Sequence, residues 1–279
     1  MAYKSLLTVL RDPEPSAAHF TLACSLAEEF DAHLQVLCLG IDQMQIGFYY
    51  TGATAMMTPD TIAAAEEQAT EIKTMVETAL KPTDIRYSCE AMVAHWGALG
   101  QVVSRFARYA DLVILPETFG EGRSPEDETI TEAALFQGPA PILTVPDSWA
   151  GKTLGKNIVI ASNQSPEEMT AVRAALPQLM AAGTTNIAIV DPPSHGPDRS
   201  DPGGALSEYL GRHGVRAEIS VLARNHARIS QTLNDHLEAR DADLLIMGAY
   251  GHSRLREAVL GGPTRDMLTD PKVPILMAH

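Results

Sequence analysis

The chain has 279 residues, of which 45% are hydrophobic and 20% charged. This composition excludes a largely disordered, collagen-like or coiled-coil protein, and the length favours about two globular domains. Thirty-five acidic residues against 21 basic ones give a net charge of −14, which argues against nucleic acid or an anionic membrane as a partner. Because no apolar run approaches the roughly 20 residues of a membrane span and no secretory signal is recognisable, we expect a cytoplasmic protein.

The three cysteines, Cys24, Cys38 and Cys89, are widely spaced and form no CxxC motif. An odd number without a histidine at ligand spacing disfavours both a disulfide scaffold and a zinc site. We expect them to be small buried apolar residues, and we expect no metal site in the chain.

Two parts of the sequence repeat one plan. Residues 4–42 can be laid on residues 156–194 without a gap, and two later blocks repeat in the same order, 110–115 on 242–247 and 140–143 on 273–276. Such a repeat indicates duplication of one structural unit. The Pro- and Gly-containing segment 145–156 separates the copies, so we predict domains at 1–147 and 155–279.

Short apolar runs predict strands in chain order at 6–10, 34–39, 112–116 and 142–146, then at 158–161, 186–190, 218–222, 243–247 and 274–278. Helical spacings lie between them, as at Ile229, Leu233 and Leu237. Strands that alternate with helices predict a parallel sheet covered on both faces. We expect Pro177 to kink or shorten its helix.

The first half is longer because of an insertion between its second and fourth strands. The later part of residues 48–81 predicts a long helix, whereas Gly47–Pro59 has two Met and two Tyr without periodicity. Two readings of this earlier part stay open, a packed insertion or a lid or partner surface.

A glycine-rich loop follows the predicted strand at 243–247. Gly248 and Gly251 let the backbone turn tightly and approach a ligand. Gly261 and Gly262 then precede Pro263, which suits the first position of a helix that runs to about Thr269. Free amides at such a loop and helix start are able to hold phosphate groups, although glycines also serve simply to close turns.

The two halves differ in charge. Residues 1–150 contain 8 basic and 21 acidic residues, a net charge of −13, whereas residues 151–279 contain 13 and 14, a net charge of −1. The first-half counterpart of the glycine loop, residues 116–128, lacks the glycine spacing and is rich in carboxylates, which repel polyphosphate. We therefore predict at most one nucleotide site per chain, in the C-terminal half.

Residues 242–279, with strand, G-x2-G-x9-G loop, helix and final strand, resemble the closing segment of the universal stress protein family, and the openings of both halves resemble it too. The resemblance implies a tandem form with two doubly wound α/β domains of the adenine nucleotide alpha hydrolase-like fold. Each would have a five-stranded parallel sheet of order 3-2-1-4-5 with helices on both faces. It implies ATP, with or without Mg²⁺, as ligand, and pairing of the two halves through their last strands. It also allows association into a homodimer.

Carried onto this sequence, the resemblance implies a set of nucleotide-binding residues in the C-terminal half, namely Ala161, Asn163, Val190, Gly248, Gly251, His252, Gly261, Gly262 and Thr264. Two positions depart from the family pattern. Gly262 stands where a Ser or Thr is usual, with Thr264 the nearest hydroxyl, and Asn163 stands where an acidic residue is frequent. In the first half, Arg11 occupies the position of Asn163, so that site looks degenerate.

The sequence offers no catalytic residues that can be named. It has neither a GxSxG nucleophile elbow nor a Walker P-loop, so we expect at most a slow ATPase. Two functions remain open. One is a stress-response protein whose adenine nucleotide controls contacts with an unknown protein partner, and the other is an interaction module that binds no nucleotide.

Overall fold

A computed structural model describes residues 2–14, 17–42, 59–120, 122–151, 154–192, 201–249 and 262–279. Its strands are β1 (Ser5–Leu10), β2 (His33–Asp42), β3 (Arg86–His95), β4 (Leu112–Pro116), β5 (Ile142–Val145), β6 (Asn157–Ala161), β7 (Thr184–Val190), β8 (Ala217–Leu222), β9 (Leu244–Gly248) and β10 (Ile275–Ala278). The helices of the first half are α1 (Ala18–Glu29), α2 (Pro59–Leu80), α3 (Leu99–Ala107) and α4 (Pro125–Gln137). Those of the second are α5 (Pro166–Ala174), α6 (Leu176–Ala181), α7 (Gly204–Arg212), α8 (Ile229–Ala239) and α10 (Pro263–Thr269).

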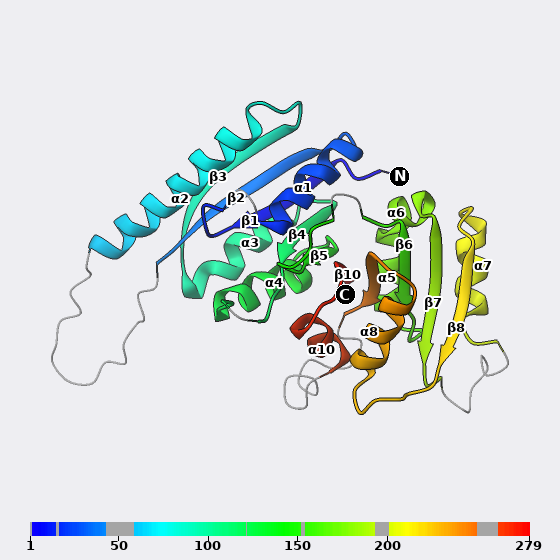
Figure 1. Cartoon of the computed structure of the whole chain (residues 1–279). Coiled ribbons are helices and arrows are strands. Elements are labelled where there is room, and N and C mark those ends of the chain that lie inside the picture. Colours follow the sequence, from blue (N-terminus) through cyan, green and yellow to red (C-terminus); the bar gives the residue numbers. More distant parts are fainter. Residues whose placement is uncertain are drawn as a thin grey trace, which may run out of the picture.

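The strands form one sheet in the order β3-β2-β1-β4-β5-β10-β9-β6-β7-β8. Each half therefore has the order 3-2-1-4-5, as predicted. Pairing is parallel throughout except between β5 and β10, which run antiparallel with Leu143 opposite Leu276. Figure 1 shows the two halves side by side with these two strands between them. The last strands of the two halves thus join them in the way that the resemblance implied.

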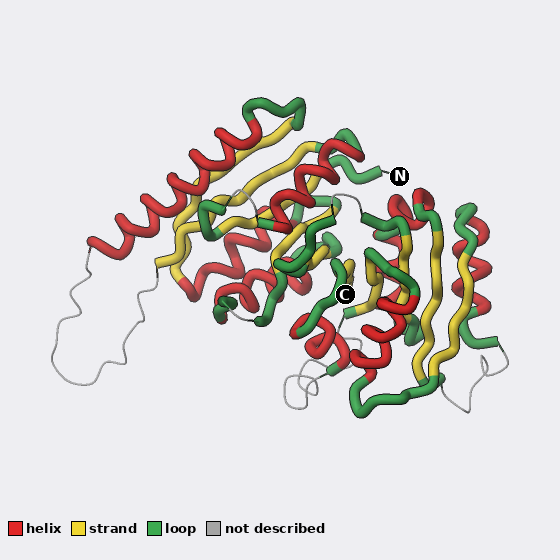
Figure 2. The backbone as a smooth tube through the Cα atoms, viewed as in Figure 1, coloured by secondary structure: helices red, strands yellow, loops and turns green. Residues whose placement is uncertain are grey.

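Helices cover both faces of the sheet. Successive strand residues point to opposite faces and pack into two separate hydrophobic clusters. In β1, Leu6 and Leu10 pack with α1 and α2, whereas Leu7 and Val9 pack with α3 and α4. The second half repeats this division, with α5, α6 and α7 on the first face and α8 and α10 on the other. Figure 2 shows the helices on either side of the strands. Strands buried on both faces explain the continuous apolar runs of the sequence.

The strand that the apolar runs did not reveal is β3, at the edge of the sheet. Within the described part of the chain it pairs with β2 alone, and most of its side chains remain partly or fully exposed. An edge strand needs no continuous apolar run, which is why its sequence, RYSCEAMVAH, gave no clear signal. The long helix predicted in the insertion is α2, whereas most of the Gly47–Pro59 segment lies outside the described residues.

Two helices of the second half have a proline in their first turn. The predicted disturbance at Pro177 is a break, because α5 ends at Ala174 and α6 begins at Leu176 with the proline in its first turn. A proline is tolerated there since the first amides of a helix have no partner within it. Likewise α10 begins at Pro263, directly after Gly262, and ends at Thr269 as predicted.

Side chains reinforce the contact between the halves. The Tyr3 hydroxyl lies 2.7 Å from the Ala174 carbonyl oxygen and 2.6 Å from Oε1 of Gln178. On the other face, Arg265 lies 3.7 Å from Glu128 and stacks over the ring of Phe119. The Arg265 guanidinium of the second half thus contacts two residues of the first half.

Cys38 and Cys89, which the sequence predicts to be small buried apolar residues, contact each other. Their sulfur atoms lie 3.1 Å apart on the neighbouring strands β2 and β3. Cys38 is fully buried and Cys89 is partly exposed, and both are free thiols. Sequence spacing conceals the pair because 50 residues, including α2, separate the two positions.

Among the described residues, no helix combines the length and the apolarity required to cross a bilayer.

Candidate functional site

The strand order of the second half reverses between β6 and β9, where the connections leave toward opposite faces of the sheet. In open α/β sheets such a point is where ligands bind, outside the carboxyl ends of the strands. Ala161 ends β6, Val190 ends β7 and Gly248 ends β9. The structure therefore brings these three predicted residues to one edge of the sheet.

Close packing explains why glycine stands at position 248. A Cβ atom at this position would lie 2.5 Å from the Glu168 backbone nitrogen and 2.9 Å from the Glu167 carbonyl carbon. The start of α5 therefore approaches the end of β9 so closely that only glycine fits. Hence Gly248 is required by the contact between α5 and β9, whatever else the loop does.

The loop after β6 is closed on itself by Glu168. This buried carboxylate accepts hydrogen bonds from the backbone amides of Asn163 at 2.8 Å and Gln164 at 2.6 Å. Ser165 caps α5 by accepting from the Glu168 amide at 3.1 Å. Gln164 has a φ of 59°, a left-handed conformation that is uncommon for a residue other than glycine. The carboxylate thus satisfies amides that a ligand would otherwise meet.

Burial raises the pKa of Glu168, although the hydrogen bonds that its carboxylate accepts from this loop oppose that effect. The amide side chain of Asn163 is also engaged, since its Oδ1 accepts from the Ser165 amide at 3.1 Å. Its backbone nitrogen and its Oδ1 are therefore used within the loop.

At the other end of the predicted motif, Gly262 is the N-cap of α10 and makes no side-chain cap. Thr264 is 4% exposed in the first turn of that helix. The contact with a ligand that the resemblance suggested for its hydroxyl stays a prediction. The remaining predicted residues, Gly251, His252 and Gly261, lie outside the described part of the chain.

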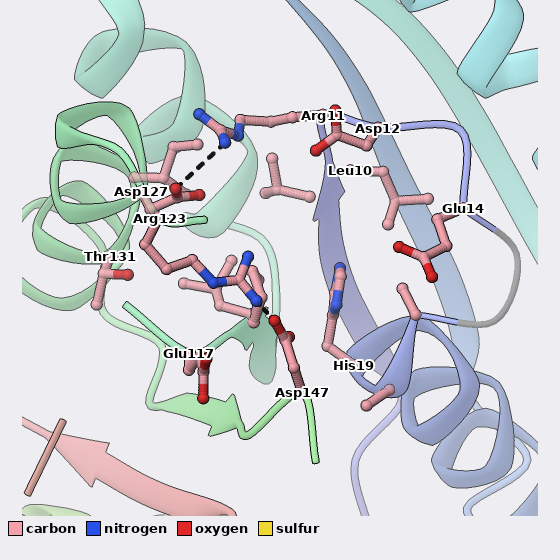
Figure 3. Close-up of a pocket in the computed structure, with 16 residues that line it drawn as sticks. Leu10, Arg11, Asp12, Glu14, His19, Glu117, Arg123, Asp127, Thr131 and Asp147 are labelled. Carbon is pink, nitrogen blue, oxygen red and sulfur yellow. Dashed lines mark hydrogen bonds and ion pairs between the residues drawn. The ribbon is translucent and has the colours of Figure 1, made fainter. Parts of the chain in front are cut away.

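The first half contains a cavity that the sequence did not reveal. It lies at the carboxyl ends of β1 and β4, where the strand order of that half reverses, and has a volume of about 220 Å³. Figure 3 shows Arg11, Asp12, His19, Glu117 and Arg123 among its labelled lining residues. We had described this position as degenerate because Arg11 replaces Asn163. No clear sequence signal marked it, because its polar residues come from three separate segments.

The described residues contain no group of His, Cys, Asp and Glu side chains arranged to hold a metal ion.

Comparison with known proteins places the second half in a family. Residues 155–279 match the model of the universal stress protein family. The universal stress protein Slr1230 of Synechocystis sp. is 34% identical over 73 residues, which is 26% of this chain and 24% of that protein. The chain thus spans about a quarter of the length of this curated relative.

Solved structures resemble the whole chain in fold. A universal stress protein from Archaeoglobus fulgidus superposes with a TM-score of 0.75 at 14% identity, covering 98% of this chain and 96% of the other. A functionally unknown protein from Pseudomonas aeruginosa superposes with a TM-score of 0.59 at 15% identity, covering 99% and 92%. At these identities the likeness concerns the fold alone. The family that these comparisons identify is thus the universal stress protein family, whose model residues 155–279 of this chain match.

Proposed function

We propose that this chain is a cytoplasmic stress-response protein that binds ATP, or a related adenine nucleotide, in its C-terminal half. The observation that carries the proposal is the position of Gly248. The G-x2-G-x9-G sequence begins there, at the carboxyl end of β9 and beside β6, within residues that match the family. Ligands bind at such a reversal point in doubly wound sheets. The phosphate donors would be the amides of residues 248–262.

Charge supports the choice of half. The second half has a net charge of −1 against −13 for residues 1–150, so a polyphosphate meets far less repulsion there. Nucleotide binding would then bias the conformation of the loop between β9 and α10, and with it the contacts of this half with a protein partner. We assign no catalytic residue, and any ATP hydrolysis would be slow.

The closed loop after β6 favours the second candidate, an interaction module without nucleotide. Because Glu168 already accepts from the Asn163 and Gln164 amides, part of the family's site is occupied by the chain itself. The proposal therefore depends on donors from the glycine loop, and a glycine substitution there separates the two functions.

Isothermal titration calorimetry of the full chain with Mg-ATP tests the proposal. We expect one site per chain, and Gly251→Asp should abolish the binding because it adds a carboxylate where the phosphates would lie. Gly211→Asp is the matched control, since Gly211 is exposed in α7 and a Cβ there meets nothing within 4 Å. Circular dichroism of both variants should match the parent chain.

Saturating Mg-ATP should also raise the melting temperature, because a ligand at 100 times its Kd stabilises the folded state by about 2.7 kcal/mol. Two nucleotides per chain would contradict the proposed division between the halves. An absence of both heat and thermal shift at millimolar Mg-ATP would favour the interaction module instead.

A further inference from the structure

The two halves differ at the loop that leads from the first strand to the first helix. In the second half the buried Glu168 carboxylate accepts from two amides of this loop. In the gapless repeat, Ser16 stands where Glu168 stands, and His19 stands where the fully buried Ala171 stands. At these two aligned positions the first half has a hydroxyl residue in place of the carboxylate and an imidazole in place of a methyl group.

Among the described residues, the N-cap and first turn of helix α1 provide no group that pairs with the positive end of its dipole. Its N-cap, Ala17, provides no side-chain hydrogen bond, and its first turn has no acidic residue. Helix α5 has both, a Ser165 cap and two glutamates in its first turn. An uncapped helix start attracts negative charge. Ala17, Ala18 and His19 all line the cavity of about 220 Å³.

His19 supplies an independent sign of a ligand. Its side chain lies against the cavity (Figure 3), the residue is only 7% exposed, and neither ring nitrogen has a hydrogen-bond partner of good geometry. Burial and the Arg123 charge lower its pKa to about 4, which the Val9 carbonyl only partly offsets. The ring is thus neutral near pH 7, with one N–H donor and one acceptor nitrogen. Buried polar groups are normally hydrogen-bonded.

Arg123 adds a second buried donor. One of its terminal nitrogens pairs with Asp147, yet its Nε is buried without a partner. Arg11, by contrast, is satisfied by Asp127 at 3.2 Å and by the Ser124 hydroxyl at 2.9 Å. The buried side-chain nitrogens without a partner are therefore on His19 and Arg123. Both suit one carboxylate group, which the start of α1 would also attract.

Carboxylates outnumber cationic side chains in the cavity. Two arginines and five carboxylates line it, which gives a net charge of −3 with neutral histidine. Burial and the neighbouring Asp147 carboxylate raise the pKa of Glu117, so a cation beside Glu117 would relieve an unfavourable charge. Asp12 projects from the opposite side of the cavity (Figure 3). A ligand whose only charged group is a carboxylate would leave the net negative charge of the cavity uncompensated.

We propose that this cavity of the first half binds a small zwitterion of the amino-acid type. Its carboxylate faces His19, Arg123 and the start of α1, where it takes the place that Glu168 has in the second half, and its ammonium group faces Glu117. The net charge excludes polyphosphate, and the volume is below the roughly 300 to 1,000 Å³ of pockets for larger ligands. The site is thus distinct from the proposed nucleotide site.

The test is calorimetric titration of the full chain with glycine, L-alanine, L-valine and L-leucine, each beside its deaminated acid and its decarboxylated amine. We expect at least one amino acid to bind more tightly than both of its analogues, because each analogue lacks one of the two charges. Equal binding by the acid would show an anion site, and equal binding by the amine a cation site. Either result, or no heat from any compound, overturns the proposal.

Variants locate the binding. His19→Gln and Arg123→Gln should each weaken it about tenfold or more, because the glutamine amide does not place its N–H where the imidazole or the guanidinium donates to the ligand carboxylate. Arg108→Gln, at an exposed position after α3, is the control and should bind as the parent does. If Arg123→Gln does not fold, as judged by circular dichroism, His19→Gln decides the outcome.

Mg-ATP distinguishes this site from the proposed nucleotide site. Titration of Mg-ATP into His19→Gln should match the parent chain, and saturating amino acid should leave nucleotide binding unchanged. Competition between the two ligands would contradict the proposal, because it would place both in one cavity. A failure of ATP to bind at all would leave the amino-acid result standing.

Discussion

At the scale of single residues, the two halves solve one problem in different ways. Both have a first loop whose amides need acceptors, and the second half supplies a carboxylate from its own helix. The sequence showed Asn163 where an acidic residue is frequent, but it did not show that Glu168, five positions later, would turn back onto the loop. That contact depends on where α5 begins, and strand and helix periodicity fixes such a boundary only loosely.

Glu168→Ala should destabilise the chain by about 2 kcal/mol, because two hydrogen bonds to a charged acceptor are lost and two amides near a buried loop remain. Urea denaturation measures the change. Glu167→Ala is the matched control from the same helical turn, since Glu167 has a buried Oε2 without a partner and should lose little. Equal effects of the two substitutions would show that Glu168 does not hold the loop.

His19 should make stability depend on pH. Its folded-state pKa is about 4, below the value of about 6.5 in an unfolded chain, so between these pH values the unfolded state binds more protons. Its contribution to the free energy of unfolding is complete above pH 6.5 and is lost as the pH falls through about 4. The total loss is about 3 kcal/mol. Urea denaturation of the parent and of His19→Gln at pH 7 and pH 4.5 measures it. Parallel losses in both proteins would contradict this assignment.

At the scale of elements, the sequence predicted most strands because burial on both faces requires continuous apolar runs. It also predicted the break at Pro177 and the start of α10 at Pro263, because proline disrupts the interior of a helix and is tolerated in its first turn. The edge strand β3 gave only a weak signal because one side of it has no neighbour. The cavity of the first half was missed because its residues meet only in the folded chain.

The thiol pair of β2 and β3 should form a disulfide when the chain is treated with an azo oxidant such as diamide. The two sulfur atoms lie 3.1 Å apart, so the thiols would lose two electrons and two protons to the diazene, which becomes a hydrazine. Peptide mapping without reductant should then recover Cys38 linked to Cys89. Cys89→Ser is the control and should give no linked peptide, whereas links to Cys24 in the parent would show that proximity does not direct the reaction.

At the scale of the whole molecule, the halves form one structural unit. The sheet is continuous through β5 and β10, and each hydrophobic cluster contains residues of both halves. We therefore expect a single cooperative unfolding transition in calorimetry. Two separate transitions would show that the halves unfold independently.

Tyr3→Phe tests the contact between the halves. The hydroxyl lies in a 5% exposed residue, 2.7 Å from the Ala174 carbonyl and 2.6 Å from Gln178. Its removal should lower the free energy of unfolding by about 1 to 2 kcal/mol, because the Ala174 carbonyl and the Gln178 side chain lose their hydrogen-bond donor. Tyr109→Phe is the control at a position that is 74% exposed, and urea denaturation should find it unchanged. A loss no larger than that of the control would show that this bond does not join the halves.

The place of the nucleotide is the central claim, and photolabelling of the full chain with 8-azido-ATP tests it most directly. After irradiation and digestion, mass spectrometry should find the label on peptides from residues 155–279, and an excess of unlabelled ATP should prevent it. Label on peptides from residues 1–147, or no label that ATP prevents, would contradict the account.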